Sequence, residues 1–286
     1  MTGSSLLKAH PLSIALLFVR TFFSPSTHRA LARYLGTVMR DFFFLQFAVK
    51  FGLKTIPVLP VDHELDRRVP FTPSKVHLYL DFVAFWIRPA LFVIRRFGWK
   101  RSAPILRSFL ETIEDCYRSA ASIYRFRMTT TKRPAYYKGP FLTIHLFDPH
   151  YLCVPSLHVI VVVLAYTFYR RIFEELKLDE EERKELGRQL YEGAVAITET
   201  VLLIKQHSVN CIPAALYTIG CITPKDVYPM ECVRFIEDLF RHSTEVLPED
   251  AKQIRQHIED MYEQLLLEGC HDSDWRSPLY RWLASR

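Results

Sequence analysis

The chain has little glycine, no dense set of cysteines and no extreme charge. Only 9 of its 286 residues are glycine, which excludes collagen-like and glycine-rich disordered chains. Its six cysteines include no C-x-x-C pair, so no disulfide framework is indicated. Lys and Arg outnumber Asp and Glu by only 37 to 31, and they are interleaved with the acids, which disfavours a nucleic-acid partner. With 49% hydrophobic and 14% aromatic residues, the chain has ample material for an ordered core.

Long uninterrupted apolar stretches are also scarce. A spanning helix needs about 20 mostly apolar residues, and only the segments 149–169 and 206–224 lack Asp, Glu, Lys and Arg for that long. Both contain His, Pro and Cys, and the mean hydropathy of the chain is only +0.03. We therefore expect a membrane protein, integral or tightly associated, whose helices pack mainly on one another.

Apolar periodicity predicts an all-α fold. Apolar residues recur at helical spacing over 105–127 and again over 248–267, where one face carries Ala251, Ile254, Ile258, Met261 and Leu265. The mixed-charge segment 174–188 predicts a solvated helix end or connector. The polar, basic and proline-containing segment 129–140 predicts a surface loop, and this loop is suited to a phosphate contact.

These patterns predict a bundle of about six core helices with additional amphipathic helices at both ends. We divide the chain into an apolar N-terminal helical region (1–104), a core that carries the motifs (105–224) and a C-terminal amphipathic extension on the same bundle (225–286).

Two short segments carry candidate chemistry. The first, Pro155-Ser156-Leu157-His158, directly precedes the apolar run VIVVVL, so it is predicted at the start of a buried helix. Free backbone N–H groups at such a start favour anions. The second is TVLLIKQHSVNC, residues 200–211. If this segment is helical, its stripe contains Thr200, Ile204, His207 and Cys211.

At these residues the chain resembles the type 2 phosphatidic acid phosphatase superfamily, particularly its membrane-lipid phosphatase and phosphotransferase branch. In that family a P-S-[GL]-H element is followed, about fifty residues later, by a K-Q-H-x-x-x-D element; here PSLH and KQHSVNC stand at that separation. The resemblance covers residues 129–222, about a third of the chain. It implies a helical bundle that acts on a phosphorylated lipid or another amphiphilic phosphate ester without a metal or other cofactor.

The resemblance also implies roles for single residues. His207 would be the nucleophile that forms a phosphohistidine, and His158 the acid that protonates the leaving alkoxide. Ser156 and the backbone around Leu157 would bind phosphate oxygens, with positive charge from Lys205, Lys132 and Arg133. Such chemistry suits imidazoles, because one can be a neutral base and the other a charged acid near pH 7.

The chain departs from the family pattern at three positions. Cys211 stands where the family places the acidic residue that orients the nucleophile, Phe126 replaces the Lys upstream of Arg133, and Val201 occupies the usual Arg position. Loss of an orienting carboxylate can cost orders of magnitude in rate. A catalytically impaired scaffold that binds lipid or a membrane partner therefore stays open as the alternative function.

A structural zinc site would use almost the same residues. Cys153, His158, His207 and Cys211 offer two thiolates and two imidazoles, which are the ligand types that zinc prefers. Their spacing differs from that of the usual short cysteine knuckles. Zinc binding is therefore a rival interpretation of the two motifs.

Overall fold

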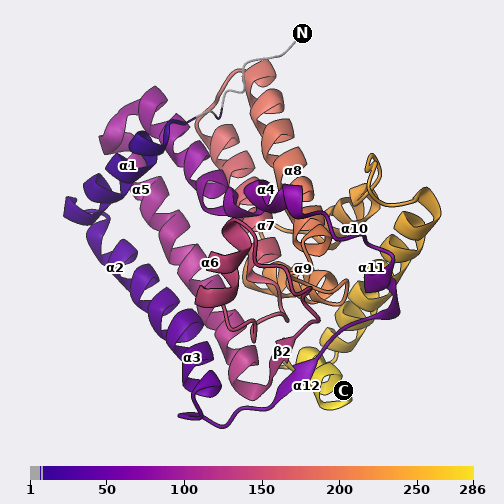
Figure 1. Cartoon of the computed structure of the whole chain (residues 1–286). Helices are drawn as coiled ribbons and strands as arrows, with labels where there is room; N and C mark the ends of the chain where they lie inside the picture. The colour runs from indigo at the N-terminus through magenta and orange to yellow at the C-terminus, as the bar shows by residue number, and fades with distance from the viewer. Residues whose placement is uncertain (1–6, 8) are drawn as a thin grey trace.

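Helix α7 (Leu157–Glu175) runs through the middle of an all-α structure, and the other long helices surround it (Figure 1). The computed structural model describes residues 7 and 9–286. The predicted fold class, an all-α helical bundle, is confirmed.

The remaining elements follow in chain order. They are α1 (Pro11–Phe23), α2 (His28–Thr37), the π-helical segment η1 (Val38–Phe44), α3 (Leu45–Lys50), β1 (Val58–Pro60), the 3₁₀ turns η2 (Glu64–Arg67) and η3 (Pro73–Lys75), α4 (Val76–Leu80), α5 (Phe82–Phe126), β2 (Met128–Thr130), α6 (Pro140–Phe147), α8 (Glu180–Leu203), α9 (Cys211–Ile222), α10 (Pro229–Asp238), α11 (Pro248–Gly269) and α12 (Ser277–Ala284).

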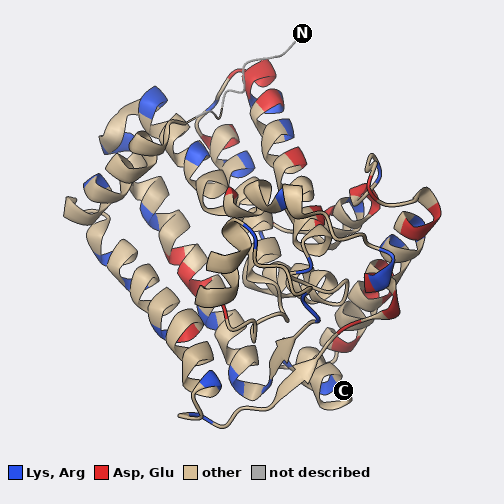
Figure 2. Ribbon diagram, in the orientation of Figure 1, with Lys and Arg blue, Asp and Glu red and all other residues tan. Residues whose placement is uncertain are grey.

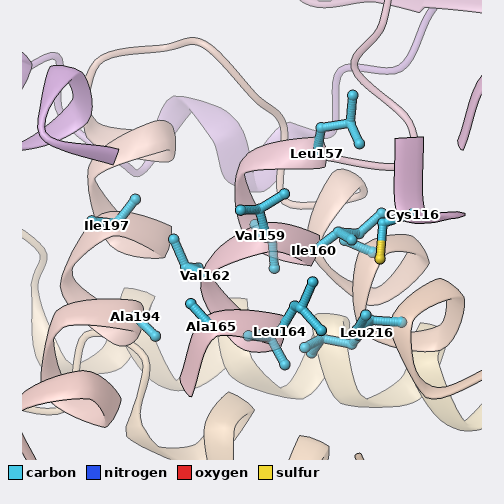
Figure 3. Packing of buried hydrophobic residues seen from close by; sticks show 14 of the residues in the cluster. Cys116, Leu157, Val159, Ile160, Val162, Leu164, Ala165, Ala194, Ile197 and Leu216 are labelled. Carbon is cyan, nitrogen blue, oxygen red and sulfur yellow. The ribbon is translucent and has the colours of Figure 1, made fainter. Parts of the chain in front are cut away.

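The core is built around α7 because residues 159–165 of this helix are apolar on every side. Residues 159–165 of α7 are all buried, and the helix packs against α5, α8 and α9. Figure 3 shows Val162 and Ala165 directed toward Ala194 and Ile197 of α8. A single apolar cluster extends from Leu7 to Leu283, so the N- and C-terminal regions share this core.

Two further helices complete the bundle from outside. α2 packs on α5, and α11 packs on α9. The predicted inward face of α11 is confirmed, since its five apolar residues, Ala251, Ile254, Ile258, Met261 and Leu265, are buried.

The charged segment 174–188 is a helix end and connector, as predicted. α7 ends at Glu175, and α8 begins after Asp179, whose carboxylate accepts hydrogen bonds from the N–H groups of Glu181 and Glu182. Figure 2 shows acidic and basic residues alternating along the first half of α8.

The predicted surface loop 129–140 is wrong at its start. Thr129 belongs to β2 and is fully buried, and Thr131 is buried as well. The physical reason is strand pairing, since β2 lies parallel to β1 with Leu59 opposite Thr129. The rest of the segment, from Lys132 on, does contain exposed residues.

The predicted helical stripe from Thr200 to Cys211 is also wrong. α8 ends at Leu203, and α9 starts only at Cys211. Lys205 takes a left-handed conformation (φ 58°), and the N–H groups of Lys205 and Gln206 bond to the carbonyls of Leu202 and Val201. This pattern is the Schellman motif, which stops a helix.

Within the described residues, one helical stretch, Pro73–Phe126, is long and apolar enough to cross a membrane. Core helices of soluble proteins pass the same test of length and composition. The segments expected from the sequence, 149–169 and 206–224, are not such helices. α7 begins only at Leu157 and is buried in the core, and α9 has 12 residues.

Candidate functional site

The structure brings His158, His207 and Ser156 together. Nε2 of His207 lies 3.3 Å from Nδ1 of His158 and 3.2 Å from Oγ of Ser156. His158 and Ser156 come from the start of α7, and His207 comes from the connection between α8 and α9. Residues 49 positions apart thus meet within hydrogen-bond distance.

Local structure explains how each ring is placed. Ser156 is the N-cap of α7, and its Oγ accepts from the N–H of Val159 at 3.5 Å, so His158 falls in the first turn. Its ring rests against the rings of Tyr79 and Phe82, with centroids 4.6 and 4.7 Å away. The Schellman turn at the end of α8 directs His207 toward this first turn.

A backbone carbonyl orients the His207 ring. Nδ1 of His207 lies 3.2 Å from the carbonyl oxygen of Cys153. A carbonyl only accepts hydrogen bonds, so Nδ1 carries the proton and Nε2 of the neutral ring has a free lone pair. The orienting role expected at Cys211 is therefore filled by the backbone carbonyl of Cys153. Cys211 itself is a fully buried thiol at the start of α9.

Beside the paired rings lies a small cavity. Its volume is about 20 Å³, and it is lined by Phe42, Tyr79, Asp148, His150, Leu152, Leu157, His158, Gln206 and His207. A space of this size holds a water molecule. The two imidazoles are also too close for a phosphoryl group between them, so this arrangement is a closed form of the site.

Arg133 reaches this region but is already paired. Its guanidinium donates to Oδ2 of Asp148 at 2.5 Å and to the Asp148 carbonyl at 3.1 Å. Asp148 also accepts from the backbone N–H of His150 at 2.9 Å, and Oγ1 of Thr131 lies 2.8 Å from Nε2 of His150. One buried network thus joins the upstream loop to the cavity.

Sequence reasoning missed Asp148 and His150. Asp148 directly precedes the uncharged segment 149–169, and His150 lies within it, a few residues before PSLH. Closeness to the PSLH element was the available signal. Gln206 of the KQH element also lines the cavity and was not singled out.

Two expected phosphate contacts point elsewhere. Nζ of Lys205 donates to the backbone carbonyls of Asp66 and Val69, because the left-handed turn directs this side chain away from the cavity. Lys132 is exposed, and its backbone N–H bonds to Oδ1 of Asp62. Neither residue lines the cavity.

The electrostatics favour neutral imidazoles. Burial lowers the pKa of His158 to about 4, with Arg133 contributing in the same direction. Burial and then His158 lower the pKa of His207 well below its usual value, and burial also lowers that of His150. Burial alone would raise the pKa of Asp148, but the hydrogen bond with His150 and the charge of Arg133 hold it below the usual range. The charged acid expected at His158 is therefore a neutral ring near pH 7 in this closed form.

The zinc interpretation gains no support. Among the described residues, no group of three or more His, Cys, Asp and Glu side chains is arranged to hold a metal ion. The thiol of Cys153 faces the ring of His150, with Sγ 3.5 Å from Nε2, and burial raises the pKa values of Cys153 and Cys211. Both thiols are therefore held in apolar surroundings, where a zinc ion would have to displace their protons to bind.

Comparison of the chain with protein-family models, with curated proteins and with solved structures finds no match. The phosphatase resemblance rests on the two motifs alone.

Proposed function

We propose that this chain hydrolyses or transfers the phosphate of a lipid-like phosphate ester through a phosphohistidine on His207. The observation that carries the proposal is that His207 Nε2 lies within 3.3 Å of both His158 Nδ1 and Ser156 Oγ. A nucleophile beside an acid–base group, with a hydroxyl at a helix start, suits attack on a phosphate ester.

The reaction would proceed in two displacement steps. The Nε2 lone pair of His207 attacks phosphorus, the bond from phosphorus to the ester oxygen breaks, and His158 protonates the leaving alkoxide. Water, or an acceptor alcohol, then gives its proton to His158 and attacks the phosphohistidine, which releases His207. Backbone N–H groups in the first turn of α7, including that of Leu157, would meet the phosphoryl oxygens.

A bound phosphate would itself raise the proton affinity of His158, which is too low for an acid in this structure. An anion next to an imidazole favours its charged form, so a phosphate would raise the pKa of His158 from about 4. Arg133 would add a permanent cation if it exchanged Asp148 for a phosphate oxygen.

A second candidate is a scaffold that binds lipid or a membrane partner without turnover. The observations that favour it are the small size of the cavity, about 20 Å³, and the pairing of Arg133 with Asp148. Both features would have to change before a phosphate could bind.

Phosphate release from para-nitrophenyl phosphate and from dispersed phosphatidic acid, both in excess chelator, separates the two candidates. We expect turnover by the parent chain, its loss in His207→Ala, and its retention in His271→Ala, which removes an exposed histidine. Acid-labile label on the parent after exposure to radioactive substrate would reveal the phosphohistidine. An inactive parent, or full activity in His207→Ala, would refute the proposed function.

A further inference from the structure

Two short segments beside the cavity leave large apolar side chains in solvent. Their six residues are 57 to 78% exposed, whereas an outward helix face is usually polar. We define the α3 rim as Phe44, Phe51 and Leu53, which lie just before and just after α3. We define the α6 rim as Leu142, Leu146 and Phe147. Grouped apolar exposure of this kind marks an interaction surface.

Both rims are attached to the walls of the same cavity. On one side, Phe42 of η1 lines the cavity, and the Gln46 side chain of α3 accepts from the N–H of Tyr151 at 2.9 Å. On the other side, α6 ends at Phe147, and the next residue, Asp148, lines the cavity. The two rims therefore flank the site of the proposed chemistry.

α6 is held by a small apolar cluster of its own. Phe141 and Ile144 pack with Val76 and Ile204 in a group separate from the main core. These contacts bury the inward face of α6, but the outward face of α6 is apolar as well. The eight residues of α6 span about 12 Å at 1.5 Å per residue, too short to cross a bilayer of about 30 Å.

The two stretches that hold the rims carry basic residues but no acidic ones, although Asp41, Asp62 and Asp148 lie at their ends. No Asp or Glu occurs in residues 42–61, which hold the α3 rim and the exposed Lys50 and Lys54. None occurs in residues 116–147, which hold the α6 rim and the exposed Lys132 and Lys138. Exposed apolar side chains bordered by lysines complement a surface with negative charge on the outside and an apolar layer directly below.

We propose that the α3 and α6 rims dock this face of the protein onto an anionic lipid bilayer, with the cavity turned toward the headgroups. The apolar side chains insert below the headgroups, and the lysines contact the lipid phosphates. The inference deepens the proposed function by naming the surface that presents the phosphate ester. Docking needs no turnover, so the two proposals can fail separately.

Vesicle binding by the full chain tests the proposal. Co-sedimentation is measured with vesicles of phosphatidylcholine plus phosphatidylglycerol and with vesicles of phosphatidylcholine alone. The α3-rim variant carries Phe44→Ser, Phe51→Ser and Leu53→Ser, and the α6-rim variant carries Leu142→Ser, Leu146→Ser and Phe147→Ser. The matched control changes three equally exposed apolar residues of other segments, Met230→Ser, Leu247→Ser and Leu267→Ser.

We expect the parent and the control to bind mixed vesicles alike, and each folded rim variant to bind at least about tenfold more weakly. Helical circular dichroism and a cooperative melt establish folding. Full binding by either rim variant, or equal binding to phosphatidylcholine alone, overturns the proposal. So does a parent that ignores vesicles but forms a dimer that the rim variants dissociate, because the rims would then serve a second copy of the chain. Vesicle binding without phosphatase turnover refutes only the proposed reaction.

Discussion

Acidification should destabilise the folded chain because its buried imidazoles are neutral. The pKa of His158 gives the size of its contribution to the free energy of unfolding. Burial lowers the pKa of His158 from 6.5 to about 4. Between these two pH values His158 therefore binds a proton in the unfolded chain but not in the folded chain. Stability then rises with pH between about 4 and 6.5, and it is lost as the pH falls through this window.

The magnitude follows from the same two values. A fall from 6.5 to about 4, at about 1.4 kcal/mol for each pH unit, gives an upper bound of about 3 kcal/mol. His158 keeps part of its surface accessible to solvent, so solvent screening reduces this figure, and we expect about 1–2 kcal/mol. The lowered pKa of His207 acts in the same direction.

Chemical denaturation of the parent and of His158→Gln, at a series of pH values from 7 to about 4, measures this contribution. The glutamine cannot titrate, while the other histidines stay in both proteins and largely cancel in the difference. We expect His158→Gln to lose about 1–2 kcal/mol less than the parent on acidification. Parallel stability curves for the two proteins would refute the neutral, buried state of His158.

Three other predictions concern neighbouring residues. Cys211→Asp should lower stability by about 3 kcal/mol or more in denaturant melts, because it places a carboxylate at a fully buried position. It should not raise the phosphatase rate, because the Cys153 carbonyl already orients His207; a faster enzyme would contradict the carbonyl-oriented ring. Asp148→Asn should strengthen binding of inorganic phosphate about tenfold, measured by calorimetry, because Arg133 loses its anionic partner; unchanged affinity would mean that Arg133 does not meet the phosphate. Ile160→Ala near the start of α7 should cost about 2–5 kcal/mol of unfolding free energy, and a loss below 1 kcal/mol would contradict the close packing around α7.

The sequence predicts those parts of the fold that depend on local pattern. The five apolar residues of α11 recur at helical spacing, and all five are buried. Ser156 stands directly before an apolar run, and it is the N-cap of α7. In both cases the same residues carry the pattern and make the contacts, so no long-range information is needed.

The end of α8 could not be predicted from the sequence, because the residue that ends the helix is not of a type that usually does so. Schellman turns usually place Gly or Asn in the left-handed position, and here that residue is Lys205. Its side chain offsets part of the conformational cost by donating to the carbonyls of Asp66 and Val69. These carbonyls lie far away in the sequence, so a continuous helix was the natural prediction. The same turn removes Lys205 from the cavity and brings His207 to it.

Asp148 and His150 depend on contacts that no local pattern encodes. Backbone bonds between Thr129 and the segment Tyr151–Cys153 hold the chain beside β2, and this places Arg133 against Asp148. The Arg133–Asp148 pair is neutral overall, and the buried imidazoles beside it are neutral as well. A phosphate dianion would thus enter before the rings are protonated, and its charge would raise their pKa values. Phosphate binding should therefore take up protons from solution near pH 7, and this uptake is the step that would convert His158 from a neutral ring to the acid that the proposed reaction needs.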